Sequence, residues 1–238
     1  MIYLLNDGAG LDPLFKIYQA EQNNLLPASI IKKIKSRMKY ALEGITRVER
    51  ASGVSYPPYY VEPALDVAST SLEIGQIGLI FARTLPLEVL GSLEIWVQLS
   101  APLIAFGEKP TIHAVIGHEF LHYVELVRRF MTLQTLSSTV PSTLFESSYA
   151  DTTDLYPAEK LLKDKRLIRL IKSRFPNGFV DEELQEKAVK RWLEKGLPIN
   201  RWSPDTHVVR VSASAVLNAR FDPVLRSKLD EVEKRSTR

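Results

Sequence analysis

Apolar residues are spaced in two different ways along this chain, and the alternation excludes both all-helical and all-strand folds. Within residues 27–51 they recur every three or four positions, which is typical of a long amphipathic helix. The members of this stripe are Ile30, Ile31, Ile34, Met38, Ala41, Leu42, Ile45 and Val48. Residues 59–106 instead hold the short apolar pieces "YYVE", "IGLIFA", "LEIWVQL" and "PLIAF", separated by glycine and proline. This second pattern predicts a small sheet, so we expect an α+β fold.

Helical spacing returns after the predicted sheet. Residues 108–133, "EKPTIHAVIGHEFLHYVELVRRFMTL", carry Pro110 near their start and an apolar stripe behind it, and predict a further helix. The patterns of residues 141–156, 157–175, 181–196 and 222–235 also favour helices. Residues 207–217 fit a strand or a helix equally well. The C-terminal part is therefore expected to be largely helical.

The composition limits the chemistry that the chain can use. With 238 residues, 45% of them hydrophobic and 25% charged, it has the composition of an ordinary globular protein. It has no cysteine, which excludes disulfides and thiolate zinc sites, so a bound metal must use His, Asp or Glu. The N-terminal segment "MIYLLNDGAGLDPLF" has no basic residues at its start, which is unlike a signal peptide. Charges and prolines interrupt the apolar residues 78–106, which is unlike a membrane-spanning helix. We therefore expect a soluble, cytoplasmic protein with no membrane partner.

Charge is distributed unevenly along the chain. Residues 1–156 carry 12 Lys and Arg against 16 Asp and Glu, whereas residues 157–238 carry 19 against 12, which gives net charges of −4 and +7. The sequence thus suggests a core over 1–156 and a basic helical region over 157–238 that packs on it. The basic region is a candidate for contact with nucleic acid or a ribosome, although a solvated Lys- and Glu-rich helical surface would look the same.

The stretch "IGHEFLHYVE" carries the clearest chemical signal. Residues four apart on a helix lie one above the other, so His118 and His122 can present imidazole nitrogens to one metal ion. Glu119 projects to one side, where it can accept a proton from a metal-bound water and pass it to a leaving amine. The residues between the histidines are uncharged, as a buried active-site helix requires.

This stretch resembles the active-site helix of the HExxH zinc metallopeptidases, the zincins. The resemblance implies Zn²⁺ held by His118 and His122, Glu119 as general base, and a protein or peptide substrate. It also implies a small mixed sheet before the helix, with an edge strand that binds extended substrate, for which "LEIWVQL" is the candidate.

The third zinc ligand defines the subclass. The metzincin pattern requires Gly and His where this chain has Glu125 and Arg128, which excludes that subclass. A gluzincin-like site would use Glu146, with Asp151 orienting a ligand histidine. The alternatives for the third ligand are an aspartate, either Asp151 or Asp154, or Glu125 from the helix that carries His118 and His122. Glu125 is also well placed to pair with Arg129 one turn later.

The remaining histidines and one tyrosine have weaker claims. His113 points off the face shared by His118 and His122, so we expect a partly buried histidine without metal. His207 and Tyr149 are candidates for stabilising an oxyanion, but a strand histidine and a core aromatic explain them as well.

Two functions follow from these observations. The first is a zinc metallopeptidase that hydrolyses peptide bonds with a Glu-activated, zinc-bound water. The alternative is a non-catalytic protein on a zincin-like scaffold that docks on nucleic acid or a ribosome through its basic C-terminal region. A third hypothesis, ranked below these two, is a core helix with two buried histidines and no metal, and it predicts that chelators change neither stability nor function.

Overall fold

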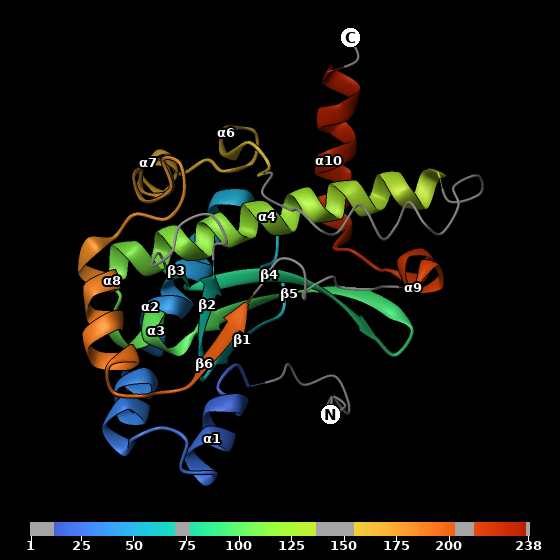
Figure 1. The fold of residues 1–238 in the computed structure, drawn as a ribbon. Coiled ribbons are helices and arrows are strands. Elements are labelled where there is room, and N and C mark those ends of the chain that lie inside the picture. The colour runs from blue at the N-terminus through green and yellow to red at the C-terminus, as the bar shows by residue number, and fades with distance from the viewer. Residues whose placement is uncertain (1–11, 70–76, 137–154, 203–211, 237–238) are drawn as a thin grey trace.

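The computed structural model describes residues 12–69, 77–136, 155–202 and 212–236 (Figure 1). The helices are α1 (Phe15–Gln22), α2 (Ala28–Ser52), α3 (Ala101–Phe106), α4 (Lys109–Leu136), α6 (Ala158–Leu161), α7 (Lys165–Arg174), α8 (Glu182–Ala188), α9 (Ala213–Asn218) and α10 (Pro223–Ser236), with a π-helical turn η1 (Val189–Leu193) directly after α8. The strands are β1 (Tyr59–Glu62), β2 (Leu65–Ser69), β3 (Ile77–Ile80), β4 (Ala82–Val89), β5 (Ser92–Ser100) and β6 (Ile199–Trp202). The fold is α+β, as the spacing of apolar residues predicted, and it contains two small mixed sheets.

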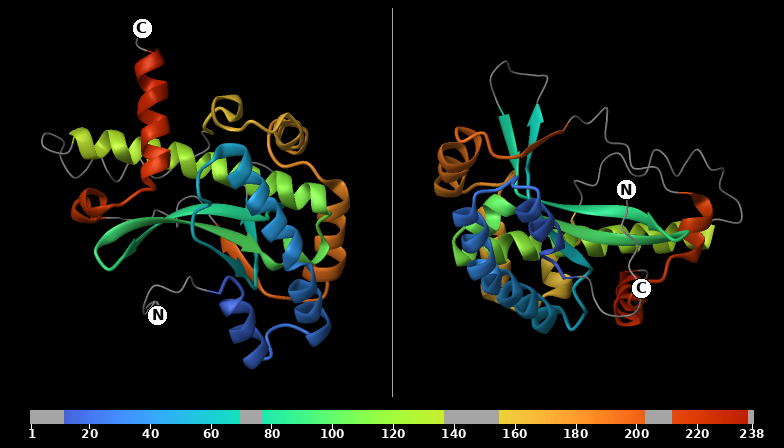
Figure 2. Two further views of the ribbon diagram at one scale, coloured as in Figure 1. Left: turned by 180° about the vertical axis from the view of Figure 1, so that it is seen from behind. Right: turned by 90° about the horizontal axis from the view of Figure 1, so that it is seen from below.

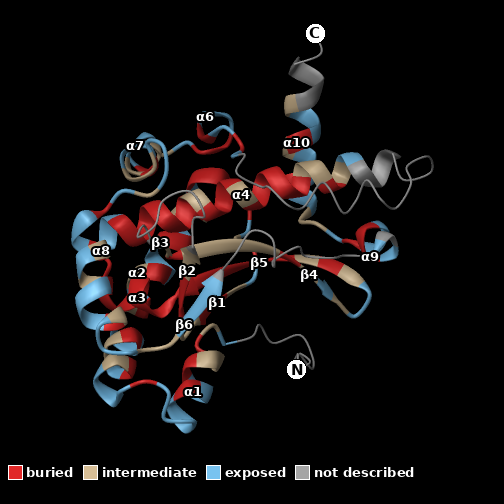
Figure 3. Ribbon diagram, viewed as in Figure 1, coloured by how far each residue is buried: buried red, intermediate tan, exposed pale blue. Residues whose placement is uncertain are grey.

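The two long helices lie where the sequence placed them. In α2 most of the predicted apolar stripe is buried, but Leu42 is exposed and Ile30 is only partly buried. The helix ends because Gly53 adopts the left-handed conformation, with φ of 66°. Helix α4 is buried along most of its described length and lies over β4 and β5, with α2 and α7 also packed against it (Figure 3). Since α2, α7 and both strands contact it, α4 forms the centre of the core.

Two three-stranded sheets precede and flank α4. In the first, the strand order is β1-β5-β4, with β1 parallel and β4 antiparallel to β5. In the second, the order is β3-β2-β6, with β3 antiparallel and β6 parallel to β2 (Figure 2). The expectation that "LEIWVQL" is an edge strand is wrong, because β5, which contains it, is the central strand of its sheet. Among the described strands, β4 forms one edge of that sheet.

Two sequence predictions need correction, and one strand was not predicted. "PLIAF" lies in helix α3, because the Ser100 side chain accepts a hydrogen bond from the Leu103 N–H and so caps a helix at the end of β5. Residues 157–175 form two helices, α6 and α7. The Asp164 carboxylate accepts hydrogen bonds from the backbone N–H groups of Arg166 and Leu167 and so caps the start of α7. Strand β6 was missed.

The C-terminal residues pack closely on the rest of the chain. Strand β6 pairs with β2, α7 packs on α4, and α9 packs on β5. The outward faces of α7 and α8 are exposed, and α10 projects away from α4 (Figures 2 and 3). Within the described ranges, no helix combines the length and the apolar character needed to cross a membrane.

Candidate functional site

Helix α4 positions the two histidines of the motif on one face. The Nε2 atoms of His118 and His122 lie 3.1 Å apart, so the two imidazoles converge on one point. Zn–N bonds of about 2.0–2.1 Å would place these nitrogens at an angle of about 100° around one ion, close to the tetrahedral value. In the metal-free protein the same distance serves a hydrogen bond between the two rings. The pair therefore fits two corners of a zinc site.

His118 packs against Phe175, the residue directly after α7. Its imidazole stacks on the Phe175 ring with centroids 3.6 Å apart and an interplanar angle of 6°. Helix α7 can approach this closely because position 117 is glycine: a Cβ there would lie 2.7 Å from Ile171 Cδ1. Burial, and secondarily the neighbouring His122, lower the pKa of His118 to about 3. The ring is therefore neutral at physiological pH, as a metal ligand must be.

Nδ1 of His118 is buried and has no hydrogen-bond partner among the described residues. The neutral ring thus has Nε2 directed at His122 and Nδ1 directed into the protein. Ligand histidines commonly donate this second N–H to a carboxylate or carbonyl. The described part of the chain does not supply that group.

Glu119 lies on the side of α4 that faces β4. Only 5% of the residue is exposed, and the Thr84 hydroxyl lies 2.7 Å from its Oε2 and 3.1 Å from its backbone oxygen. Burial raises the pKa of Glu119 to about 7, although the Thr84 hydrogen bond and the charge of Arg83 oppose the rise. A carboxyl with this pKa exchanges its proton readily near neutral pH, which suits a general acid and base.

The other candidate residues fall into two groups. The Glu125 carboxylate pairs with Arg128, 2.6 Å away, and with Arg129, 3.1 Å away, so the predicted pairing with Arg129 is confirmed. Burial opposes ionisation of Glu125, but the hydrogen bonds from these arginines outweigh it and lower its pKa. The positions outside the described residues are Glu146, Tyr149, Asp151, Asp154 and His207.

Sequence reasoning did not find Thr84, Phe175 or Tyr56. The Tyr56 hydroxyl donates to the Ile116 carbonyl at 3.1 Å, and its ring stacks on Phe120 with centroids 5.7 Å apart. Burial raises the pKa of Tyr56, and the charge of nearby Glu119 adds to the rise. None of these residues stands in a recognisable motif, because each reaches α4 from a different part of the chain.

The described residues bring together two candidate metal ligands, His118 and His122. No group of three or more His, Cys, Asp or Glu that could hold a metal ion occurs within ranges 12–69, 77–136, 155–202 and 212–236. Comparison with models of known protein families, with curated proteins and with solved structures finds no match. The inference to function therefore starts from the geometry around α4.

The raised pKa of Glu119 predicts a pH-dependent stability. Between about pH 4.5 and pH 7 the folded metal-free protein keeps a proton that the unfolded chain has lost, so the free energy of unfolding falls as pH rises. Glu119→Gln removes this dependence. We expect its stability relative to wild type to increase by about 3 kcal/mol from pH 4 to pH 8, measured by urea denaturation with a chelator present.

Glu125→Gln provides the control with the opposite sign. Because the pKa of Glu125 is lowered, its ionised form stabilises the folded protein, and this stabilisation is lost as pH falls below the ordinary glutamate value. The Glu125→Gln variant should therefore lose stability relative to wild type as pH rises through the acid range. A Glu119→Gln difference that is flat with pH would contradict the raised pKa.

Proposed function

We propose that this protein is a zinc-dependent metallopeptidase whose site is built on α4. The observation that carries the proposal is the convergence of two Nε2 atoms 3.1 Å apart on a helix that also carries Glu119, a buried glutamate with its pKa raised to about 7. Two converging imidazoles and a carboxyl poised near neutrality are groups that can support hydrolysis of an amide at a metal centre.

Each residue has a distinct task in the proposed reaction. Zinc, when bound, polarises the scissile carbonyl and acidifies water. Glu119 takes a proton from the attacking water and transfers it to the nitrogen of the leaving amine. Thr84 is a positioning residue, since its hydroxyl holds Oε2 of Glu119 toward β4. His118 and His122 would hold the ion, and Phe175 fixes the ring plane of His118.

The third zinc ligand is part of the same proposal. Glu146 is the proposed third ligand, with Asp151, Asp154 and Glu125 as alternatives, and the gluzincin-like subclass depends on this assignment. The ion pairs of Glu125 with two arginines favour the other candidates over it.

The proposed substrate is a protein or peptide in an extended conformation. We place it along β4, because β4 is an edge among the described strands and carries Thr84 beside Glu119. We propose a cytoplasmic location, supported by the absence of cysteine from the whole sequence.

Metal content is the experiment that tests this proposal. Protein purified without a histidine tag should contain close to one zinc per chain by elemental analysis. The variant His118→Ala/His122→Ala should lose it, because both described ligands are removed. Lys195→Ala, an exposed residue on another part of the surface, is the control and should keep its zinc. A wild-type protein that neither contains zinc nor takes it up when supplied would rule out the peptidase.

A further inference from the structure

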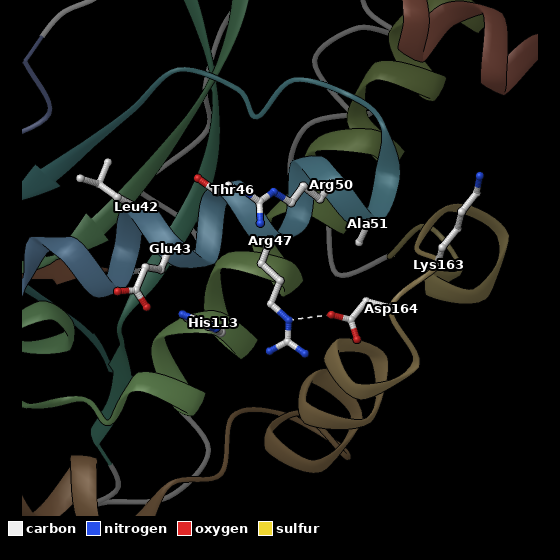
Figure 4. A pocket seen from close by; sticks show the side chains of 9 residues that line it. All are labelled: Leu42, Glu43, Thr46, Arg47, Arg50, Ala51, His113, Lys163 and Asp164. Atoms are coloured by element: carbon white, nitrogen blue, oxygen red, sulfur yellow. Dashed lines mark hydrogen bonds and ion pairs between the residues drawn. The ribbon is translucent and has the colours of Figure 1, made fainter.

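Two adjoining hollows lie where α2, the start of α4 and α7 meet. One has a volume of about 750 Å³ and is lined from α2 and the residues just before α7. The second, of about 740 Å³, is lined from α4 and α7. Figure 4 shows the side chains that line the first hollow, among them Arg47 and His113. These two residues also line the second hollow, so the hollows form one groove.

The groove is strongly basic. Its cationic side chains are Arg47, Arg50, Lys109, Lys163, Arg166 and Arg169, against the two acids Glu43 and Asp164. Both acids are already neutralised, since Asp164 pairs with Arg47 at 2.7 Å and Glu43 pairs with Lys109. The other four cations are exposed and form no ion pair with the described residues. The groove thus presents four uncompensated positive charges on its two sides.

His113 forms a wall shared by the two hollows and carries an unsatisfied atom. Only 6% of the residue is exposed, and its ring hydrogen-bonds the Tyr40 backbone. Its Nε2 is buried and finds no partner in the described part of the chain. Buried polar atoms are normally hydrogen-bonded, so this nitrogen is an exception, but because it is buried it is not open to the groove. Burial, with Arg47 and Lys109, lowers the pKa of His113, which leaves the arginines and lysines as the positive groups.

We propose that this groove binds the sugar–phosphate backbone of a nucleic acid strand. The four free cations are spread over two hollows instead of converging on one point, which matches a chain of phosphates better than a single small anion. Among the described residues, no Phe, Tyr or Trp lines either hollow and the His113 ring is buried, so the groove offers no exposed platform for stacking bases. Binding is therefore expected to depend on charge and not on base sequence.

This surface differs from the basic region that the sequence suggested. The groove takes Arg47, Arg50 and Lys109 from the N-terminal core, so residues 157–238 supply only part of it. His113 and His118 are five residues apart, which places them about 140° apart around α4. The groove and the candidate metal site thus use different faces of one helix, and the proposal does not depend on the peptidase.

The test compares two triple variants of the full chain. The groove variant is Arg50→Gln/Arg166→Gln/Arg169→Gln. The control, Lys195→Gln/Arg220→Gln/Arg226→Gln, removes the same charge from exposed cations of the C-terminal region that do not line the groove. Fluorescence anisotropy of a labelled 20-nucleotide single-stranded RNA would measure affinity between 50 and 300 mM salt, with circular dichroism to verify folding. If the triple variant does not fold, the single variants Arg50→Gln and Arg169→Gln are measured in its place.

We expect wild-type protein to bind the RNA in a salt-dependent manner. The groove variant should bind at least tenfold more weakly at 50 mM salt, with a salt slope smaller by about 2, because three phosphate contacts are lost. The control should stay within twofold of wild type. Equal losses in the two variants, or no binding at 50 mM salt, would overturn the proposal. Displacement of the RNA by polyglutamate of equal charge as effectively as by unlabelled RNA would instead assign the groove to an acidic protein.

Discussion

Replacement of Glu119 by Gln should reduce peptide hydrolysis by about a thousandfold while zinc stays bound, because a positioned general base contributes roughly 10²- to 10⁴-fold. The amide keeps the shape of the carboxyl and can still hydrogen-bond Thr84, but it takes no proton from water. Loss of activity without loss of metal would therefore separate the role of Glu119 from those of His118 and His122.

The measurement uses casein labelled with a self-quenched fluorophore, beside zinc analysis of the same preparations. Glu62→Gln is the matched control, a half-buried glutamate on β1 that pairs with Lys16 far from α4 along the chain. It should retain wild-type activity. If Glu119→Gln keeps activity within tenfold of wild type, Glu119 is not the base. Loss of zinc and activity together would assign Glu119 a structural part in the site.

The parts of the site that were predictable are those set by one helix. The positions of His118 and His122 follow from the regular turn of α4, so their convergence could be read from a four-residue spacing. The pairing of Glu125 with Arg129 follows from the same geometry. Helix α2 was equally predictable, because its apolar stripe and Gly53 are local signals.

The parts that were missed depend on contacts between distant segments. Thr84 lies 35 residues before Glu119, and only the packing of β4 on α4 brings them together. Whether a strand is an edge or a centre depends on its neighbours, and β5 is central because β1 joins it in parallel from earlier in the chain. Strand β6 was missed because a four-residue strand has little periodicity and pairs with residues more than a hundred positions away.

Asp66→Ala is expected to lower the free energy of unfolding by about 3 kcal/mol, because removing one partner of a buried ion pair leaves its neighbours unsatisfied. Asp66 is 2% exposed and accepts hydrogen bonds from three strands. The donors are Arg83 at 3.2 Å, Gln98 at 2.9 Å and Asn200 at 2.9 Å. Because Asp66 and Asn200 belong to one sheet and Arg83 and Gln98 to the other, this carboxylate joins the two sheets.

Urea denaturation at pH 7 would measure the loss, with Glu183→Ala as the surface control. Glu183 pairs with Lys187 on an exposed helix face, and its removal should change stability by less than about 0.5 kcal/mol. Asp66→Asn separates charge from hydrogen bonding, since it keeps the shape and one acceptor, and should lose about half as much as Asp66→Ala. A loss below about 1 kcal/mol for Asp66→Ala would mean that the sheets are joined by apolar packing alone. Because Arg83 is next to Thr84 and its charge opposes the rise in the pKa of Glu119, Asp66 also links the sheet junction to the candidate catalytic base.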